Sequence, residues 1–341
     1  MYFVRYGKGF MKSKTKINIS DEVIRQIFLT KDFGDVLAIK SLAAGEFNSV
    51  FCVEVEGGKK YVLKVAPSES AEVLNFEKNM MAWEVDAYDL VRKNTSMRVP
   101  EVFVFDNSKV IINADYFVME YINAKTVDKA KLISRGGNLP LEKIKIKQHL
   151  AQFLGELHKI KGDGFGYPQV GLKENWYLAF KSMVEGLKAD SEKKGKKVKE
   201  IDVLLGYIET HKTILEKVES VLVNFDLWEN NVFSLPNKKL ALIDPERSFW
   251  GDRVGDFVAL EYLKPPAKKQ YLLDAYNAVS DYKLIWDKET QVRYYLMTIY
   301  LGLIMKIERP YRYKKSQLKY WLHGLGAKMF LRQGLKQLKK I

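Results

Sequence analysis

The chain has 341 residues, of which 47% are hydrophobic and 29% charged, a balance that predicts a packed globular protein rather than a disordered one. Its single cysteine, Cys52, excludes an internal disulfide and a cysteine-based metal site, and we expect a reducing, cytoplasmic location. The net charge of +14 admits nucleic acid, an anionic membrane surface or an anionic small molecule as a partner, without choosing among them.

The segment from about Leu37 to Ile122 has the alternation of strands, with one helix inserted. The helix is expected from Asn75 to Lys93, because the chain reaches Pro100 soon afterwards. Gly57 and Gly58 mark a tight hairpin. The predicted strands are Ser49–Val55, Lys60–Ala66, Glu101–Phe105, Val110–Ala114 and Tyr116–Ile122.

After Asn123 the periodicity becomes helical. Apolar residues recur at the spacing of one helix face at positions 146, 150, 153, 154 and 157. Residues from Asn175 to Ser220 predict two amphipathic helices around a lysine-rich loop, an insertion that would shape a substrate cleft. The longest strongly apolar stretch, Tyr294 to Met305, is far shorter than the roughly 20 residues of a spanning helix, so we expect no membrane partner.

Short strand-like runs interrupt the helical part at Val221–Val223, Val232–Phe233 and Leu240–Ile243. The loops that follow them hold Asp226, Asn231 and Asp244. Polar residues at strand ends converge where a rigid scaffold aims them, and carboxylate and amide oxygens suit magnesium. Asp226 would orient a hydroxyl and take its proton, with Asn231 and Asp244 as metal ligands. The alternative is that such residues populate ordinary turns.

Two further groups of residues are candidates for nucleotide binding. Gly45, Asn48 and Ser49 precede a strand, as in a loop bent over phosphates, although one glycine there is also an ordinary turn. Lys64 alternates away from the apolar side of its strand, and Glu84 lies on the apolar stripe of the next helix. A buried carboxylate there requires a cation, so we expect an ion pair that aims the lysine at phosphates.

The histidines, at positions 149, 158, 211 and 323, show no metal-ligand spacing, and His158 is expected to be a structural histidine. There is also no GxxxxGK[ST], GxGxxG or GxSxG motif. Four aromatic residues line either an acceptor pocket or the core: Trp176, Tyr177, Trp228 and Trp250.

The runs Leu222–Phe233, Ile243–Arg247 and Trp250–Phe257 resemble the aminoglycoside phosphotransferase family, the choline kinase-like branch of the protein-kinase-like fold. Leu150–His158 is similar to the family's helix ahead of the catalytic loop. The resemblance extends from about Leu42 to Tyr262 and implies an α+β, two-lobed fold. The lobes would be a β-rich nucleotide-binding lobe (residues 1–120) and a mainly α-helical catalytic and acceptor-binding lobe (124–341, with the helical insertion at about 175–220), joined by a hinge (121–123).

The resemblance also implies ATP and Mg²⁺ as cofactors. Adenine would bind the hinge backbone around Glu120 and Ile122, and the phosphates would meet Lys64 and the Gly45 loop. The catalytic aspartate corresponds to Asp226, the metal ligands to Asn231 and Asp244, and the brace of the catalytic loop to Asp256. This chain departs from the family at Asn224, where the family usually has histidine.

We therefore expect a kinase that transfers the γ-phosphoryl group of ATP to a hydroxyl of a small molecule. The basic C-terminal half favours a neutral or anionic metabolite over a polycationic aminoglycoside. A nucleotide-binding relative that has lost turnover is the alternative, supported by Asn224. A nucleic-acid-binding protein is a third hypothesis, which no nucleic-acid motif supports. The oligomeric state stays open.

Overall fold

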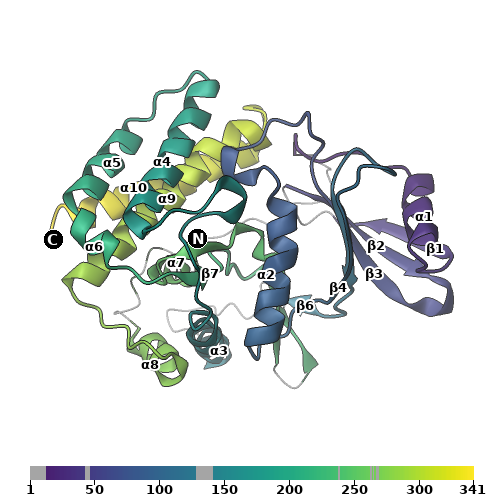
Figure 1. The fold of residues 1–341 in the computed structure, drawn as a ribbon, viewed down its shortest axis with the longest axis horizontal. Coiled ribbons are helices and arrows are strands. Elements are labelled where there is room, and N and C mark those ends of the chain that lie inside the picture. The colour runs from purple at the N-terminus through teal and green to yellow at the C-terminus, as the bar shows by residue number, and fades with distance from the viewer. Residues whose placement is uncertain are drawn as a thin grey trace.

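The computed structural model describes residues 13–42, 47–127, 141–236, 239–261, 263, 265 and 269–341. An antiparallel sheet forms the N-terminal part, and helices dominate the C-terminal part (Figure 1). This is the α+β architecture that the sequence predicted.

The N-terminal sheet has five strands in the order β1-β2-β3-β5-β4, and each neighbouring pair is antiparallel. One face of the sheet packs against α1 (Asp21–Thr30), and α2 (Met80–Asn94) lies on the other side (Figure 1). Two short 3₁₀ turns, Glu56–Gly58 and Asn75–Glu77, lie in the connections. The strands are β1 (Val36–Ser41), β2 (Ser49–Val55), β3 (Lys60–Val65), β4 (Val102–Asp106) and β5 (Tyr116–Glu120).

The alternation of β3 divides its side chains between two cores. Tyr61, Leu63 and Val65 join the core under α1, whereas Val62 joins the larger core on the side of α2. Lys64 shares the face of Val62, since side chains two residues apart point the same way. The predicted orientation of Lys64 is therefore confirmed, and its ammonium is directed toward α2.

Two predicted elements were wrong in detail. The expected strand Val110–Ala114 is an irregular turn, because the preceding segment bends sharply and Lys109 has a φ of 61°. The expected helix from Asn75 to Lys93 is broken at Asn79, whose backbone is left-handed, so that α2 begins at Met80.

Asp106 anchors the bend after β4. Its Oδ1 accepts hydrogen bonds from the main-chain nitrogen of Ser108 at 2.9 Å and from the Ser108 hydroxyl at 2.6 Å. Its Oδ2 accepts from Tyr116 at 3.0 Å and pairs with Lys31 at 2.7 Å. The bonds from Lys31 and Ser108 lower the pKa of Asp106 well below its usual range. The carboxylate thus ties β4 and β5 to the end of α1.

The C-terminal part contains eight α-helices among the described residues. Three of them, α4, α5 and α6, lie between residues 175 and 220, and α4 and α5 match the pair of helices predicted there. Two 3₁₀ turns, Pro168–Val170 and Pro245–Arg247, accompany the helices. The helices are α3 (Leu141–Leu157), α4 (Trp176–Lys193), α5 (Lys199–Thr210), α6 (Lys212–Glu216), α7 (Val254–Leu260), α8 (Gln270–Val279), α9 (Lys288–Arg312) and α10 (Leu318–Leu338).

The described residues also form two small sheets. One pairs β7 (Val221–Val223) with β10 (Phe249–Gly251), and the other orders β6 (Lys125–Thr126), β8 (Val232–Ser234) and β9 (Leu240–Leu242). Gly251 is required where it stands, because a Cβ there would lie 2.4 Å from the Trp176 ring. These strands hold the loops that carry the polar motif.

The end of α9 returns to the N-terminal part. Arg312 forms a buried ion pair with Glu77, and its guanidinium lies 4.6 Å from the centre of the Phe47 ring. Along α9 and α10, Gly302 and Gly334 allow close approach of the two helices. In the described part of the chain, no helix is long and apolar enough to span a membrane.

Candidate active site

Lys64 of β3 and Glu84 of α2 form the predicted ion pair. The ammonium donates to the two carboxylate oxygens of Glu84 at 2.7 and 2.8 Å. Glu84 is completely buried and Lys64 nearly so. A buried charge without a partner is strongly destabilising, so the pair fixes both side chains between the sheet and α2.

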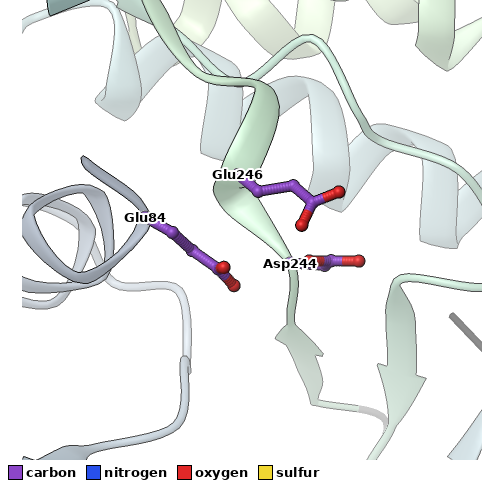
Figure 2. A group of neighbouring side chains, drawn as sticks. All are labelled: Glu84, Asp244 and Glu246. Atoms are coloured by element: carbon purple, nitrogen blue, oxygen red, sulfur yellow. The ribbon is translucent and has the colours of Figure 1, made fainter. Parts of the chain in front are cut away.

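Two acidic residues after β9 complete this cluster. Asp244 also pairs with the Lys64 ammonium, and Glu246 lies 3.1 Å from it. Figure 2 shows Glu84 reaching from α2 toward the segment that carries Asp244 and Glu246, and one oxygen from each carboxylate lies within 4.8 Å of the others. Asn48 donates to Glu246 at 2.8 Å, so the segment before β2 contacts the same group.

The cluster holds more negative charge than its lysine neutralises. Burial, followed by repulsion from Asp244, raises the pKa of Glu246 to about 7. Burial also raises the pKa of Glu84 well above its usual range. Burial alone would lower the pKa of Lys64, but Asp244, Glu246 and Glu84 together raise it well above normal. The lysine therefore stays charged, and the excess of carboxylates favours an additional cation.

The β8–β9 hairpin places Asn231 beside Asp244. Val232 pairs with Leu242, and the nitrogen of Ile243 donates to the carbonyl of Asn231 at 2.9 Å. Asn231 precedes β8 and Asp244 follows β9, so both polar residues lie at the same end of the hairpin. The left-handed backbone of Asp244 (φ 64°) is held by a bond from its nitrogen to the Tyr88 hydroxyl at 2.8 Å.

Asp226 occupies the loop between β7 and β8. The side-chain nitrogen of Asn231 donates to Asp226 Oδ2 at 2.7 Å and to its main-chain carbonyl at 3.1 Å. These bonds use the amide nitrogen of Asn231 and direct its carbonyl oxygen elsewhere. Asp226 and Asn231 thus form one unit, joined through the hairpin to Asp244.

The loop reaches Asp226 through a strained residue. Phe225 has a φ of 57°, which is costly for a bulky side chain. Its ring packs against Phe249 and Tyr300 at centroid distances of 5.4 and 6.0 Å. The core contacts offset the strain and fix the direction in which the chain enters the loop.

Asp256 of α7 braces this turn, and it is fully buried. Its carboxylate accepts from the main-chain nitrogens of Asn224 at 3.1 Å and Phe225 at 2.6 Å. His158 bonds to the same carboxylate at 3.0 Å and to the Tyr276 hydroxyl at 3.0 Å. Burial lowers the pKa of His158, so it is a neutral structural histidine, as predicted.

Asn224 supports the loop although it replaces the expected histidine. Its Oδ1 accepts from the main-chain nitrogen of Asp226 at 3.0 Å. This bond closes a short turn directly before the aspartate, a role that asparagine performs readily.

Burial is the main influence on Asp226 and raises its pKa to about 7. Arg247 opposes this effect, whereas Asp244 and Glu246 add to it. Arg247 is itself held by Glu308 of α9 at 2.9 Å. The carboxyl of Asp226 is therefore balanced between its protonated and ionised forms near neutral pH.

Other predicted residues lie apart from this cluster or serve the fold. The Ser49 hydroxyl donates to the Ile17 carbonyl at 2.9 Å, and Gly45 lies outside the described residues. Glu120 ends β5, where its side chain pairs with Arg98, and the Ile122 carbonyl accepts from Ala124 at 3.0 Å.

The four aromatic candidates differ in burial. Trp176 is 1% exposed and stacks between Phe180 and Phe249, so it belongs to the core. Tyr177 is buried too, and its hydroxyl donates to Glu209 at 2.8 Å. Trp228 and Trp250 are only half-buried.

The structure adds three site residues that the sequence argument missed. Glu246 lies within the run Ile243–Arg247, and its position two residues after Asp244 indicated a place in the same site. Arg247 had the same signal, because it directly follows that pair. Tyr88 lies on α2, one turn after Glu84, and nothing in the sequence indicated its bond to the nitrogen of Asp244.

Known structures share the whole fold at low sequence identity. Choline kinase LicA from Streptococcus pneumoniae matches with a TM-score of 0.60 and 15% identity, covering 94% of this chain and 99% of that one. A microcompartment-associated aminopropanol kinase gives 0.59 and 15%, with coverage of 94% and 98%. The streptomycin-ATP-APH(2")-IIa ternary complex gives 0.57 and 19%, with coverage of 92% and 99%.

No curated protein matches the sequence. The phosphotransferase enzyme family matches residues 38–279, which include the Lys64 cluster and the loop of Asp226. The fold is that of the aminoglycoside phosphotransferases and choline kinases, and the chain belongs to the phosphotransferase enzyme family.

Proposed function

We propose that this protein is an ATP-dependent kinase that phosphorylates a hydroxyl group of a small molecule. The observation that carries the proposal is the meeting of two units. One is the buried Lys64–Glu84 pair with Asp244, and the other is Asp226 held by Asn231. Phosphoryl transfer depends on positioning and electrostatic stabilisation, which these groups supply.

Lys64 and the segment before β2 would hold the phosphates of ATP. Lys64 stays charged and is fixed by Glu84, so its ammonium presents a positive charge at a defined position. Gly45, Asn48 and Ser49 are proposed to contact the phosphates.

The backbone around Glu120 and Ile122 is proposed to bind adenine, because it follows β5 at the edge of the part that carries Lys64. On this proposal residues 1–120 form the nucleotide-binding lobe, 121–123 the hinge and 124–341 the acceptor-binding lobe.

The donor set at the end of the β8–β9 hairpin fits Mg²⁺. Asn231 and Asp244 offer hard oxygen ligands, and the excess of buried carboxylates around Lys64 favours a divalent cation. When bound, the ion would neutralise charge on the phosphates. Glu246, which adjoins Asp244, is proposed to contribute to the same field.

Asp226 is proposed to orient the acceptor hydroxyl and accept its proton. Burial raises its pKa to about 7, which suits a general base near neutral pH. Asn224 and Asn231 bond to Asp226 directly, and Asp256 holds the residue before it, Phe225. The loop is thus built for catalysis even without the family's usual histidine.

The acceptor is proposed to be a neutral or anionic hydroxylated metabolite. The related structures include proteins named for choline and aminopropanol, and a complex with streptomycin. A polycationic acceptor needs unpaired acidic residues near the base. Here Glu308 is paired with Arg247 and Glu77 with Arg312, so neither offers an unpaired carboxylate. The remaining negative charge, around Lys64, is assigned on this proposal to Mg²⁺.

Magnesium-dependent ATP turnover tests the proposal, with sugars, amino alcohols, nucleosides and aminoglycosides as acceptors. We expect transfer to one neutral or anionic class, and loss of about a thousandfold or more in Asp226→Asn. Asp35→Asn, at an exposed acid of the N-terminal part, is the control and should retain full activity. An active Asp226→Asn variant would contradict the assignment. ATP binding without transfer to any acceptor would favour the non-catalytic alternative.

A further inference from the structure

The outer face of α10 carries a stripe that is apolar at one end and basic at the other. Its first members are exposed: Leu318 by 48%, Trp321 by 61% and Leu325 by 46%. Exposed basic residues continue the stripe at Lys328, Arg332, Lys336 and Lys339. The spacing of three and four residues keeps all seven on one side of the helix.

The other side of α10 is committed to the core. Tyr320, Phe330, Leu331 and Gly334 are buried, and the helix lies along α9 in the helical part of the molecule (Figure 1). The stripe therefore faces away from the protein. Its apolar members are not needed to hold the helix in place.

No acidic residue of the same segment offsets the positive charge of this face. Between residues 309 and 341 the sequence contains no aspartate or glutamate. The four basic residues of the stripe form no ion pair with the described acidic side chains. Its basic end is thus a concentrated positive field rather than a set of surface salt bridges.

Folding adds a second basic segment to the same region. The lysine-rich loop between α4 and α5 reaches the start of α10, where Lys196 bonds to the Tyr320 hydroxyl at 3.3 Å. Lys197 of this loop is exposed, as are Lys193 at the end of α4 and Lys199 at the start of α5. Two lysine-rich segments more than a hundred residues apart in sequence therefore lie next to each other.

Trp321 is suited to leave water. Its ring nitrogen already donates to the carbonyl of Lys315 at 2.9 Å. The indole can therefore enter an apolar environment without leaving its N–H group unsatisfied. Tryptophan and leucine beside lysine and arginine is the composition of helices that lie in a membrane interface.

We propose that the outer face of α10, with the adjoining lysine loop, is a peripheral docking surface for an anionic membrane. Trp321 and its two leucine neighbours would enter the boundary between headgroups and acyl chains, and the basic residues would contact anionic headgroups.

A nucleic acid fits the surface less well. Phosphates would pair with the lysines, and a base would stack on Trp321. Leu318 and Leu325, however, provide neither a stacking surface nor a hydrogen bond for a base. The exposed apolar group at the end of the stripe therefore favours lipid over RNA.

Co-sedimentation of the full chain with vesicles tests the proposal. The vesicles would be phosphatidylcholine alone or with about 30% phosphatidylglycerol, an anionic lipid. We expect binding to the anionic vesicles only, weakening as salt rises. Trp321→Ser should reduce binding about tenfold or more. Lys328→Glu with Lys336→Glu should reduce it by at least about 25-fold, at roughly fivefold for each of the two positive charges removed.

Matched controls change similar residues elsewhere. Val110→Ser, at a side chain that is 83% exposed, and Lys40→Glu with Lys159→Glu should stay within about twofold of the parent. Unchanged thermal unfolding in every variant separates binding from folding.

Three results would overturn the proposal. The first is no binding to anionic vesicles. This result includes the case in which the stripe variants instead abolish binding of single-stranded RNA or formation of a dimer. The second is equal binding to phosphatidylcholine alone, and the third is equal binding by the stripe variants.

Discussion

Replacing Asp256 by alanine should both destabilise the protein and disable its catalytic loop. The carboxylate accepts three hydrogen bonds, from the nitrogens of Asn224 and Phe225 and from His158. Buried bonds to a charged acceptor contribute about 1.5–3 kcal/mol each. The variant also no longer buries a carboxylate, and the removal of that desolvation penalty offsets several kcal/mol of the loss in stability. The expected net loss in the free energy of unfolding is about 3–5 kcal/mol.

The catalytic effect should exceed what unfolding explains. Without the brace, the left-handed turn at Phe225 loses its support, and Asp226 is no longer held in one direction. We expect kcat to fall at least about a hundredfold at a temperature where the variant is folded. The ATP dissociation constant should stay within about threefold, because Lys64 and Asp244 lie on other segments.

Urea unfolding and steady-state kinetics measure the two effects separately. Asp256→Asn, which retains one acceptor oxygen, should fall between alanine and the parent in both. Asp35→Ala, at an exposed acid, should change stability by less than about 0.5 kcal/mol. Parental stability in Asp256→Ala would refute the hydrogen-bond reasoning, and parental kcat would refute the brace.

Three further predictions follow from the same structure. Lys64→Met should weaken ATP binding about tenfold or more by equilibrium dialysis and lower stability by about 3–5 kcal/mol. The double variant with Glu84→Gln should recover stability but not ATP binding, because it no longer buries an unpaired charge. Asp106→Asn should cost about 2 kcal/mol at pH 7. The folded pKa of Asp106 is depressed, so its contribution is complete above about pH 4 and is lost as the pH falls; the difference between variant and parent in urea unfolding should shrink toward pH 3. Gly251→Ala should cost about 1–3 kcal/mol because its Cβ meets an indole ring, whereas Gly186→Ala, in open space within α4, should stabilise by about 0.5–1 kcal/mol in thermal unfolding.

The sequence predicted the parts of the site that follow from local periodicity. Alternation in β3 placed Lys64, and the stripe of α2 placed Glu84, so their ion pair was predictable before any coordinates. The polar residues at the ends of short strands were found in the same way. These residues are close in sequence to the elements that orient them.

The rest depends on long-range contacts that leave no periodic trace. The bond from Asp244 to Tyr88 joins segments 156 residues apart, and the Arg312–Glu77 pair joins segments 235 apart. Helix α1 was not predicted, although Ser20 caps it and the acids that follow are typical of a helix start. The expected strand at Val110–Ala114 had suitable side chains, but the Asp106 bend prevented pairing.

The strained turn at Phe225 has a consequence for how this enzyme would evolve. Its backbone is held by a ring that packs against Phe249 and Tyr300, both deep in the helical part. A change in the volume of either neighbouring side chain would shift the Phe225 ring and the backbone turn that it holds, although neither neighbour contacts a substrate. We expect laboratory selection for a new acceptor to recover substitutions at these interior aromatic positions, alongside those that line the acceptor site.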